Sequence, residues 1–148
     1  MITLIFLCAL SSHVQIASAH EPGQRLIITG HIFGPDGKAR SGVIVSAHHA
    51  DARGIYLAPG KRGPNPKVEA RLWGRLATAA DGSYRIDTIM PSGYGGGAAH
   101  VHLVLRDASK EQFQILQFDN GPNAGILTRD AKGVYHCVRN FRLKGAAR

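Results

Sequence analysis

Two histidines in the second half of the chain have the spacing of a metal-binding pair. His100 and His102 stand on either side of Val101, inside a run of strand-forming residues from 98 to 106. Side chains alternate between the two faces of a strand, so both imidazoles project from one face and the apolar residues of the run form the other. Imidazole is the commonest metal ligand in proteins, and two of them on one rigid strand predict a metal-binding edge. Two exposed strand histidines are the alternative interpretation.

Tyr94 is a further candidate ligand, six residues before His100 in a glycine-rich loop at 91–97. A free phenol has a pKa of about 10, so it binds a metal ion as phenolate only where a strong Lewis acid stabilises the anion. Ferric iron is small, hard and triply charged, and it meets this condition. Tyr94 is therefore a candidate iron ligand, and an aromatic side chain on a surface loop is the alternative interpretation.

The elements that must position these residues are short apolar runs separated by turn signals, a pattern typical of an all-β sandwich. Asp81-Gly82 between two such runs is one of the strongest hairpin signals. Residues 54–67 and 91–97 hold too many glycines and prolines to form strands and are expected to be loops. We expect a β-sandwich of two mostly antiparallel sheets, without a helix of usual length, and with strands at 25–33, 43–47, 72–77, 83–90, 98–106, 113–118 and 134–143.

The first 19 residues have the pattern of a signal peptide. An apolar run at 2–10 precedes Ala17-Ser18-Ala19, whose small side chains suit cleavage after Ala19. The run is too short to cross a bilayer, so no membrane anchor is expected. The sequence therefore predicts a secreted or periplasmic protein with a signal peptide at 1–19 and one domain at 20–148.

Charge and cysteine content narrow the range of partners. The formal net charge is +8, and a basic protein attracts anions such as nucleic acids, acidic surfaces or small carboxylates. No nucleic-acid motif accompanies the charge, so phenolic or other aromatic acids are the anions that an exported domain favours. Cys137 is the one cysteine after Ala19. We therefore expect no intrachain disulfide and interpret Cys137 as a buried small apolar residue.

Three blocks of the sequence, in order, resemble the intradiol ring-cleavage dioxygenase family, which includes the catechol and protocatechuate dioxygenases. The first block follows a Gly-Val-Ile-Val strand and reads Ala50-Asp51-Ala52-Arg53-Gly54-Ile55-Tyr56. The second begins at Gly74-Arg75, continues through Asp81-Gly82-Ser83-Tyr84-Arg85-Ile86 and leads to Tyr94. The third is Ala98-Ala99-His100-Val101-His102-Leu103. Together the blocks span residues 27–106 and are more specific than any single motif.

The resemblance implies a cofactor and a reaction. Members of the family hold one non-haem Fe(III) ion by two tyrosinates and two histidines, and water or hydroxide completes the shell. The matching positions in this chain are Tyr56, Tyr94, His100 and His102. A catechol displaces one tyrosinate, which helps to accept the substrate protons, and O2 opens the ring between the two hydroxyls to a cis,cis-muconate. Tyr56 is thus assigned as a ligand and as a catalytic residue. The implied partners are a catechol-type small molecule and O2, with no nucleic acid or membrane, and homo-oligomerisation is left open.

The chain departs from the family pattern three residues before the first histidine. Relatives carry an arginine there, which stabilises charge on the ring, whereas this chain has Gly97. We expect Arg75 to take over this catalytic role, and the further candidates are Arg53, Lys61 and Arg62. The loop from the second tyrosine to the first histidine is also shorter than in most relatives, and the N-terminal helical region of many catechol-type members is missing.

Other positions in the blocks leave alternatives open. The glutamine that relatives carry on the strand after the histidines matches either Gln114 or Gln117. Either His48 or His49 is a candidate for lining the pocket, since family members often carry an aromatic residue in this stretch. Tyr84 matches a core position of the family and is interpreted as a packing residue.

Two interpretations compete with an active enzyme. Transthyretin-like and carboxypeptidase-regulatory-like sandwiches share the opening Gly-His-Ile-x-Gly-Pro-Asp-Gly turn and the Asp-Gly-Ser-Tyr-Arg hairpin, and such domains bind partners without a metal. The two tyrosines and the His-x-His pair distinguish the enzyme from this binding module, which has no need of them. An iron-binding relative with little turnover is the other alternative, and Gly97 is consistent with it.

Overall fold

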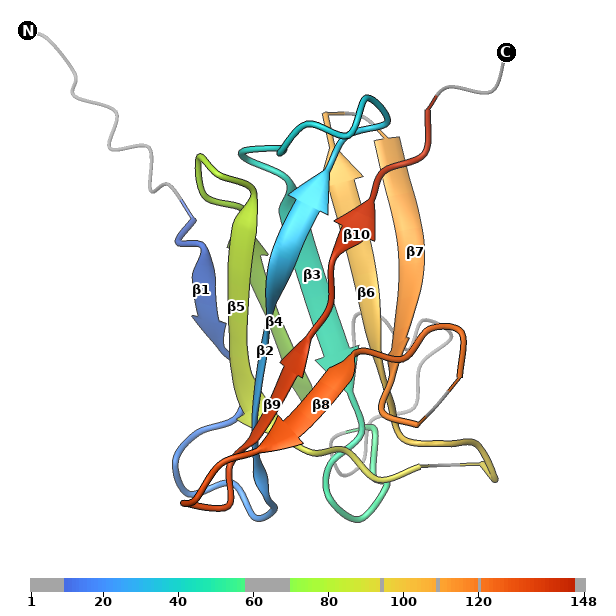
Figure 1. Ribbon diagram of the computed structural model, residues 1–148. Helices are drawn as coiled ribbons and strands as arrows, with labels where there is room; N and C mark the ends of the chain where they lie inside the picture. Colours follow the sequence, from blue (N-terminus) through green and yellow to red (C-terminus); the bar gives the residue numbers. More distant parts are fainter. Residues whose placement is uncertain (1–9, 58–69, 94, 109, 120, 146–148) are drawn as a thin grey trace, which may run out of the picture.

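The computed structural model describes residues 10–57, 70–93, 95–108, 110–119 and 121–145, and the regular elements of these segments are all β-strands (Figure 1). The strands are β1 (His13–Gln15), β2 (Arg25–Phe33), β3 (Ile44–His49), β4 (Leu72–Ala77), β5 (Ser83–Ile89), β6 (His100–Asp107), β7 (Lys110–Gln117), β8 (Ile126–Arg129), β9 (Tyr135–Val138) and β10 (Phe141–Arg142). In these segments no helix has the length and apolar character needed to cross a membrane.

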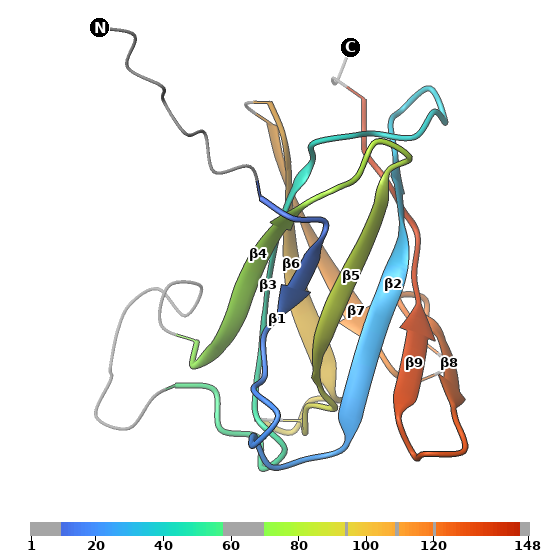
Figure 2. The same ribbon diagram turned by 90° about the vertical axis from the view of Figure 1, so that its left-hand side faces the viewer.

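The strands form two layers, a six-stranded and a four-stranded sheet (Figures 1 and 2). The larger sheet has the order β1-β5-β2-β9-β8, and β10 pairs with β2. The smaller sheet has the order β4-β3-β6-β7 and is antiparallel throughout. The predicted all-β sandwich of two mostly antiparallel sheets is confirmed. The core lies between the sheets, where the inward side chains of β2 and β6 are at most 1% exposed: Leu26, Ile28, Ile32, Val101, Leu103 and Leu105.

Strand β3 is longer than the sequence predicted, and the extension matters for the site. The expected strand ended at residue 47, but β3 continues through His48 and His49. Both residues keep their register with β4 on one side and β6 on the other, and His48 lies opposite His102. Pairing with two neighbours therefore carries the strand past the point where its apolar pattern stops.

The expected strand at 134–143 is divided into β9 and β10, which both run parallel to β2. Between them the carbonyl of Arg139 accepts the hydroxyl of Tyr84 (2.7 Å), and the side chain of Asn140 accepts the amide of His31 (2.8 Å). Gly30 allows this close approach, because a β-carbon there would lie 1.8 Å from the Arg139 carbonyl oxygen. Strands β1 and β8 have no counterpart among the predicted strands.

Residues 11–17, which precede the predicted cleavage site, are part of the sandwich. Strand β1 runs parallel to β5, and the carbonyls of Ser11 and Ser12 accept the amides of Ala77 (3.0 Å) and Arg85 (2.9 Å). Ala17 is completely buried. The folded domain thus extends beyond the expected boundary at His20. Cleavage after Ala19 stays a prediction, and it would remove β1 from the edge of its sheet.

Two residues interpreted as core residues are buried. Cys137 is 0% exposed, and burial raises the pKa of its thiol to about 11. A thiol that stays protonated is a poor nucleophile and a poor metal ligand. Tyr84 is 3% exposed and packs in the main apolar cluster. Both therefore stabilise the sandwich and take no part in the site described below.

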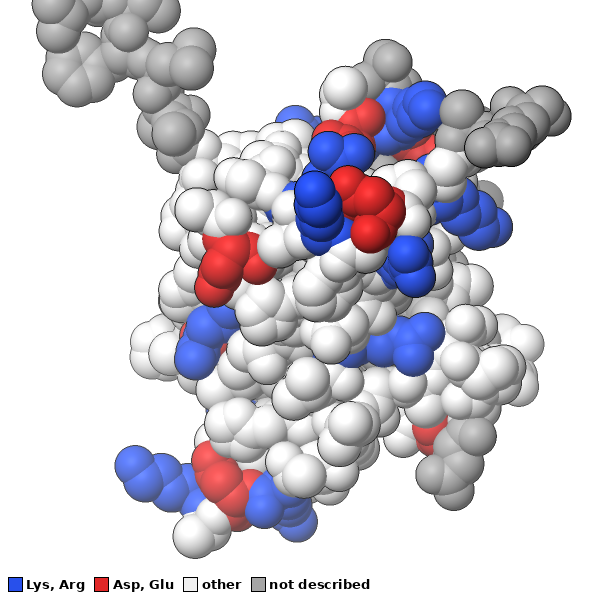
Figure 3. Space-filling view, turned by 45° about the horizontal axis from the view of Figure 1, so that its top comes forward, with Lys and Arg blue, Asp and Glu red and all other residues white. Residues whose placement is uncertain are grey.

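The charge of the domain is distributed in small groups on the face shown in Figure 3. Lysine and arginine side chains there lie beside acidic side chains, and they do not form one continuous basic patch. A duplex nucleic acid requires an extended basic stripe. Among the described residues, the face in Figure 3 shows no such stripe.

Candidate metal centre

The two histidines of the His-x-His pair lie on the outer face of strand β6. Val101, Leu103 and Leu105 of the same strand point into the core and are at most 1% exposed, whereas His100 and His102 are half-buried on the opposite face. Strand β6 is an inner strand, hydrogen-bonded to β3 on one side and to β7 on the other. The backbone that carries the two imidazoles is therefore fixed from both sides.

The two imidazole rings converge on one point. Their Nε2 atoms are 3.0 Å apart, and the rings are nearly perpendicular, with an interplanar angle of 85°. Two nitrogens that bind one metal ion at about 2.1 Å and at a right angle to each other lie about 3.0 Å apart. The measured spacing therefore fits two adjacent ligands of a single ion.

A carbonyl group orients the first of these rings. The Nδ1 atom of His100 lies 2.7 Å from the carbonyl oxygen of Ala98. Since a carbonyl can only accept, Nδ1 carries the proton, and the lone pair of the neutral ring is on Nε2. Metal-binding histidines in proteins are commonly oriented in this way by a carbonyl or a carboxylate.

Tyr56 lies beside the histidines, at the end of a tight turn that follows β3. Its ring meets the ring of His102 edge to face, with the centroids 6.4 Å apart, and meets His48 in the same manner at 5.8 Å. His48 is stacked on His102 with 5.0 Å between centroids. The structure thus brings three of the four predicted ligands, Tyr56, His100 and His102, together on the outer face of the smaller sheet.

Tyr94, the remaining predicted ligand, lies outside the described residues. The loop around it is described at Gly93 and at 95–97. A β-carbon on Gly93 would lie 2.0 Å from the carbonyl oxygen of Gly97, so the two ends of this short loop are in close contact. The loop leads directly into β6 and the histidine pair.

The structure separates the two histidines at the end of β3. His48 points to the outer face, where it stacks on His102. His49 points inward and is 1% exposed, with Nδ1 2.7 Å from the carbonyl oxygen of Ala50 and Nε2 2.7 Å from the hydroxyl of Thr88. Desolvation lowers the pKa of His49. His48 is therefore the histidine that belongs to the site, and His49 is a structural residue that links the two sheets.

Strand register also assigns the glutamine that the sequence left ambiguous. Gln117 lies directly opposite His100 on β7, and Gln114 lies opposite Leu103. Residues opposite each other in a sheet share a face. Gln117 is thus on the face of the histidines, and Gln114 is on the face of the core.

The residues that are candidates for the role of the arginine that relatives carry at the position of Gly97 differ in their location. Arg75 lies on β4 opposite Ser46, on the same outer face as His48, and its Nε donates to the Ser46 hydroxyl (3.3 Å). The side chain of Arg53 is 76% exposed and contacts Asp51. Lys61 and Arg62 lie outside the described residues. Among the described candidates, Arg75 is therefore the one whose strand position faces the site.

The turn that carries Tyr56 is held by a buried carboxylate. Oδ1 of Asp51 accepts the amides of Arg53 (2.9 Å) and Ile55 (2.9 Å), and the side chain of Asp51 is 3% exposed. Gly54 has a φ of +81°, which the turn requires. Sequence reasoning included Asp51 in the first block but assigned it no role.

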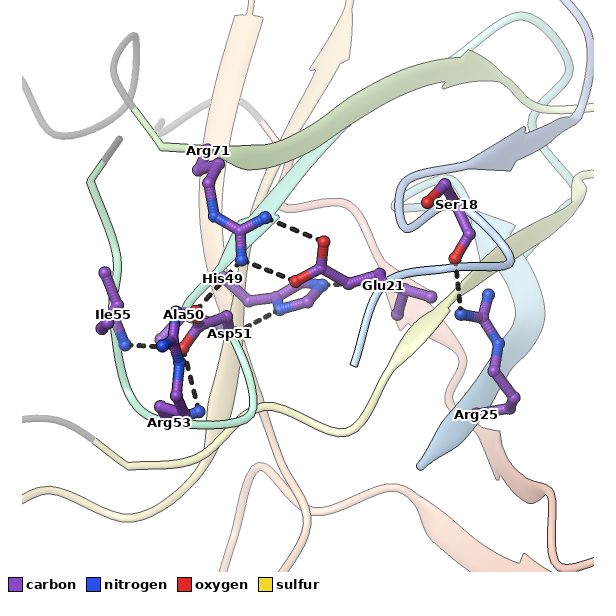
Figure 4. Close-up of polar contacts among 10 residues, drawn as sticks. Ser18, Glu21, Arg25, His49, Ala50, Asp51, Arg53, Ile55 and Arg71 are labelled. Carbon is purple, nitrogen blue, oxygen red and sulfur yellow. Dashed lines mark hydrogen bonds and ion pairs between the residues drawn. The ribbon is translucent and has the colours of Figure 1, made fainter. Parts of the chain in front are cut away.

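Arg71 and Glu21 complete this polar cluster, which is shown in Figure 4. The guanidinium of Arg71 donates to both oxygens of Glu21 (2.8 and 2.6 Å) and to Asp51 (3.1 Å). Burial alone would raise the pKa of Asp51, but hydrogen bonds from the Ile55 and Arg53 amides and from both guanidinium groups outweigh it and lower the pKa. The hydrogen bonds that Arg71 donates to Glu21 lower the pKa of Glu21 and raise the pKa of Arg71. All three side chains are therefore charged at neutral pH.

The donor set indicates which metal could bind. Among the described residues, no three His, Cys, Asp or Glu side chains form a metal-binding group. Tyr56 is beside the convergent histidines, and its phenol oxygen is a further candidate ligand. Phenolates require a strong Lewis acid. The residues present thus fit a ferric ion better than a soft or weakly charged metal.

Curated proteins with a similar sequence are catechol dioxygenases. Catechol 1,2-dioxygenase 2 of Acinetobacter lwoffii is 32% identical over 159 aligned positions, which cover 92% of this chain and 56% of that protein. Catechol 1,2-dioxygenase 1 of the same organism is 40% identical over 70 positions, covering 47% of this chain and 22% of that protein. The chain thus spans about half or less of the length of these relatives.

Solved structures share the fold. The dioxygenase domain of a dioxygenase carbohydrate-binding protein fusion from Streptomyces sp. SirexAA-E has a TM-score of 0.73 at 23% identity, covering 99% of this chain and 96% of that one. Catechol 1,2-dioxygenase from Pseudomonas arvilla C-1 has a TM-score of 0.74 at 21% identity, covering 92% of this chain and 57% of that one. The Streptomyces domain is the same sandwich over nearly its whole length.

A family model described as "Dioxygenase" matches residues 9–112. The match includes strands β1 to β6 and therefore His48, Tyr56, His100 and His102. It begins ahead of β1, in agreement with the place of that strand in the sandwich. The chain belongs to the intradiol ring-cleavage dioxygenase family, as the three sequence blocks predicted.

Proposed function

We propose that this protein is an Fe(III)-dependent intradiol dioxygenase that opens a catechol-type ring with O2. The proposed ligands are His100, His102, Tyr56 and Tyr94. The observation that carries the proposal is the 3.0 Å separation of the two histidine Nε2 atoms beside the ring of Tyr56. Membership of the family supports the same reaction class.

The chain's own residues have distinct tasks in this reaction. When bound, the ferric ion supplies the charge that stabilises phenolates and the one-electron chemistry through which O2 reacts with an aromatic ring. The carbonyl of Ala98 keeps the proton of His100 on Nδ1, so the lone pair of His100 Nε2 points toward Nε2 of His102, 3.0 Å away. Tyr56, beside the histidine pair, would accept a hydroxyl proton of the catechol. Both atoms of O2 enter the product, a cis,cis-muconate, so no external reductant is needed.

The surroundings of the site suit a flat aromatic substrate. Trp73 and Ile115 flank His48 and His102 across the sheet, and they are 56% and 42% exposed. They supply apolar surface on which a ring can lie. Arg75, on the same face, supplies a cation. We therefore propose a substituted or carboxylated catechol as the substrate, with Arg75 acting in place of the arginine that relatives have at the position of Gly97.

The visible spectrum and metal content of the purified protein test this proposal. Tyrosinate-to-iron(III) charge transfer colours such a site red to burgundy, so we expect about one iron per chain, as four protein ligands for one ion imply. Adding a catechol should shift the absorption band, consume O2 and yield a muconate. Extradiol semialdehyde products would contradict the intradiol mechanism.

An iron-binding relative with little turnover is the second candidate, and the absence of an arginine at Gly97 favours it. The same experiment separates the candidates. A coloured iron protein whose band shifts with catechol but that consumes no O2 would be this relative. A colourless protein that stays metal-free after reconstitution with iron would be a metal-free binding module.

Export is proposed from the N-terminal sequence pattern alone. We propose a secreted or periplasmic protein whose signal peptide is cleaved after Ala19. Residues 11–17 contribute β1 and the buried Ala17 to the uncleaved chain, and cleavage would remove them. The N-terminal residue of the protein recovered from its host tests the proposal, and a chain that retains residues 11–17 would contradict it.

A further inference from the structure

Arg71 joins three segments of the chain around the base of the Tyr56 turn. Its guanidinium binds Glu21 through two hydrogen bonds and Asp51 through a third (Figure 4). Its backbone amide donates to the carbonyl oxygen of Tyr56 (3.0 Å). Arg71 therefore contacts the proposed ligand residue directly through its backbone and indirectly through the carboxylate that shapes the turn.

Asp51 is a second junction, because it contacts both tyrosine-bearing segments. Its carboxylate accepts the amides of Arg53 and Ile55, just before Tyr56. Its carbonyl oxygen accepts the amide of Ser92 (3.0 Å), which lies two residues before Tyr94. One residue thus links the end of β3 to the two segments that hold the proposed phenol ligands.

The three charged side chains of this cluster are largely buried. The side chains of Asp51, Glu21 and Arg71 are 3%, 14% and 29% exposed. Removing charges from water is costly, and apolar side chains of similar volume often stabilise a fold as well or better. Paired arginine–carboxylate contacts, however, fix the direction and distance of both partners. The cluster is therefore better suited to positioning the turn than to adding stability.

We propose that Glu21, Arg71 and Asp51, here called the clamp, are positioning residues that hold the phenol of Tyr56 at the histidine pair. The role rests on the proposed function, in which Tyr56 is one of the ligands of the ion. Hydrogen bonds with the amides of Arg53 and Ile55 and with the carbonyl oxygen of Tyr56 fix the backbone that carries the phenol.

The test compares Glu21→Gln, Arg71→Lys and Asp51→Asn with the control variant Arg106→Gln. Glu21→Gln keeps the size of the side chain and removes one charge of the clamp. Arg106 pairs with Glu111 at the other end of strand β6, so its variant removes an arginine–glutamate contact on the same sheet. If Asp51→Asn fails to fold, the two milder variants still decide the outcome.

The first readout needs no metal. In the metal-free protein, amide hydrogen exchange at Arg53 and Ile55 should be about tenfold to a hundredfold faster in Asp51→Asn, the loss expected for hydrogen bonds to a charged acceptor. Nuclear Overhauser contacts between the rings of Tyr56 and His102 should weaken in all three clamp variants. The control should change neither.

The second readout uses the iron-loaded protein. The clamp variants should keep their iron, shift the tyrosinate charge-transfer band and lower kcat with little change in KM, whereas the control keeps the wild-type band. Unchanged exchange, ring contacts and band position in Arg71→Lys and Glu21→Gln would overturn the clamp. If the wild-type protein binds no iron, the proposed function fails, and the exchange and ring-contact results alone decide whether the clamp holds Tyr56.

Discussion

His100 and His102 are held by the hydrogen-bond ladder of an inner strand, whereas Tyr56 is held by side chains around a turn. The histidines have β3 and β7 on either side, so two strand pairs fix the backbone that carries them. Tyr56 lies at the end of the turn after β3, and the contacts that shape this turn come from Asp51 and Arg71. One half of the candidate centre is rigid by backbone pairing, and the other is positioned by a polar network.

The difference corresponds to the different tasks of the two halves in the proposed reaction. A ligand that stays bound throughout a catalytic cycle benefits from a fixed backbone. A residue that accepts a proton from the substrate must be held within hydrogen-bond reach of it, which the polar network can do by fixing the turn.

Removing either imidazole should strongly weaken iron binding, because it removes one of the two proposed ligands on β6. We expect His100→Ala and His102→Ala to weaken iron binding by more than about a hundredfold, since changes even to residues behind a ligand cost tenfold to a hundredfold. Iron per chain after dialysis measures the effect. His136→Ala is the control, because His136 lies on β9 in the other sheet and pairs with Asp130. Wild-type iron content in either ligand variant would refute the site.

Replacing the phenol of Tyr56 should spare the fold and impair turnover. Tyr56→Phe keeps the ring beside His48 and His102 but removes the group proposed to accept a proton, a contribution of about a hundredfold or more. Tyr84→Phe is the matched control, since its hydroxyl donates to the Arg139 carbonyl in the core. That variant should lose about 1 kcal/mol of stability at unchanged turnover. Equal oxygen uptake by Tyr56→Phe and the wild type would contradict the role of Tyr56.

The cation proposed to act on the substrate is Arg75. It can be removed, and an arginine can be introduced at Gly97. Arg75→Ala should lower kcat by about a hundredfold, the usual effect of losing a preorganised charge, with the iron band unchanged. Gly97→Arg should raise kcat on catechol, and Gly97 has no positive φ that would oppose the substitution. Arg85→Ala, which breaks a surface contact with Asp87 on the other sheet, serves as the control. A wild-type rate for Arg75→Ala would exclude compensation by this residue.

The N-terminal segment should contribute to stability and to the anchoring of the clamp. A chain that begins at His20 loses β1 and Ala17, and also Val14 and Ile16, which pack against the core. We expect its unfolding free energy to fall by about 2–4 kcal/mol, as for the exposure of one or two apolar side chains. Urea denaturation of chains that begin at Leu10 and at His20 measures the difference. Coincident transitions would show that β1 is dispensable.

Acid should weaken the polar network around the Tyr56 turn. The pKa values of Asp51 and Glu21 are lowered in the folded chain, below the value of about 4 of an unfolded carboxyl group. Their contribution to stability is therefore complete above about pH 4 and is lost as the pH falls through the folded values. The stability difference between wild type and Glu21→Gln should shrink accordingly in urea titrations at successively lower pH. A difference that stays constant would contradict the charge-based role of Glu21.

The local pattern of the sequence was enough to predict the sandwich, most of its strands and the common face of His100 and His102. Alternation of apolar and polar residues is a property of neighbouring positions, and it is visible without knowledge of the partner strand. The three blocks likewise indicated the family, because each lies within a short stretch of the sequence.

Pairings between distant segments were decided only by the tertiary structure. The register of β6 with β3 and β7 brought His48 to His102 and chose Gln117 over Gln114. Arg71 reaches Glu21 across 50 positions of the chain, and a contact of that range leaves no periodic pattern in the sequence. Strand β1 has three residues and forms through its bonds to β5, so its own residues predict it poorly. Strand formation depends on local alternation, but which strands and side chains meet depends on how the whole chain packs.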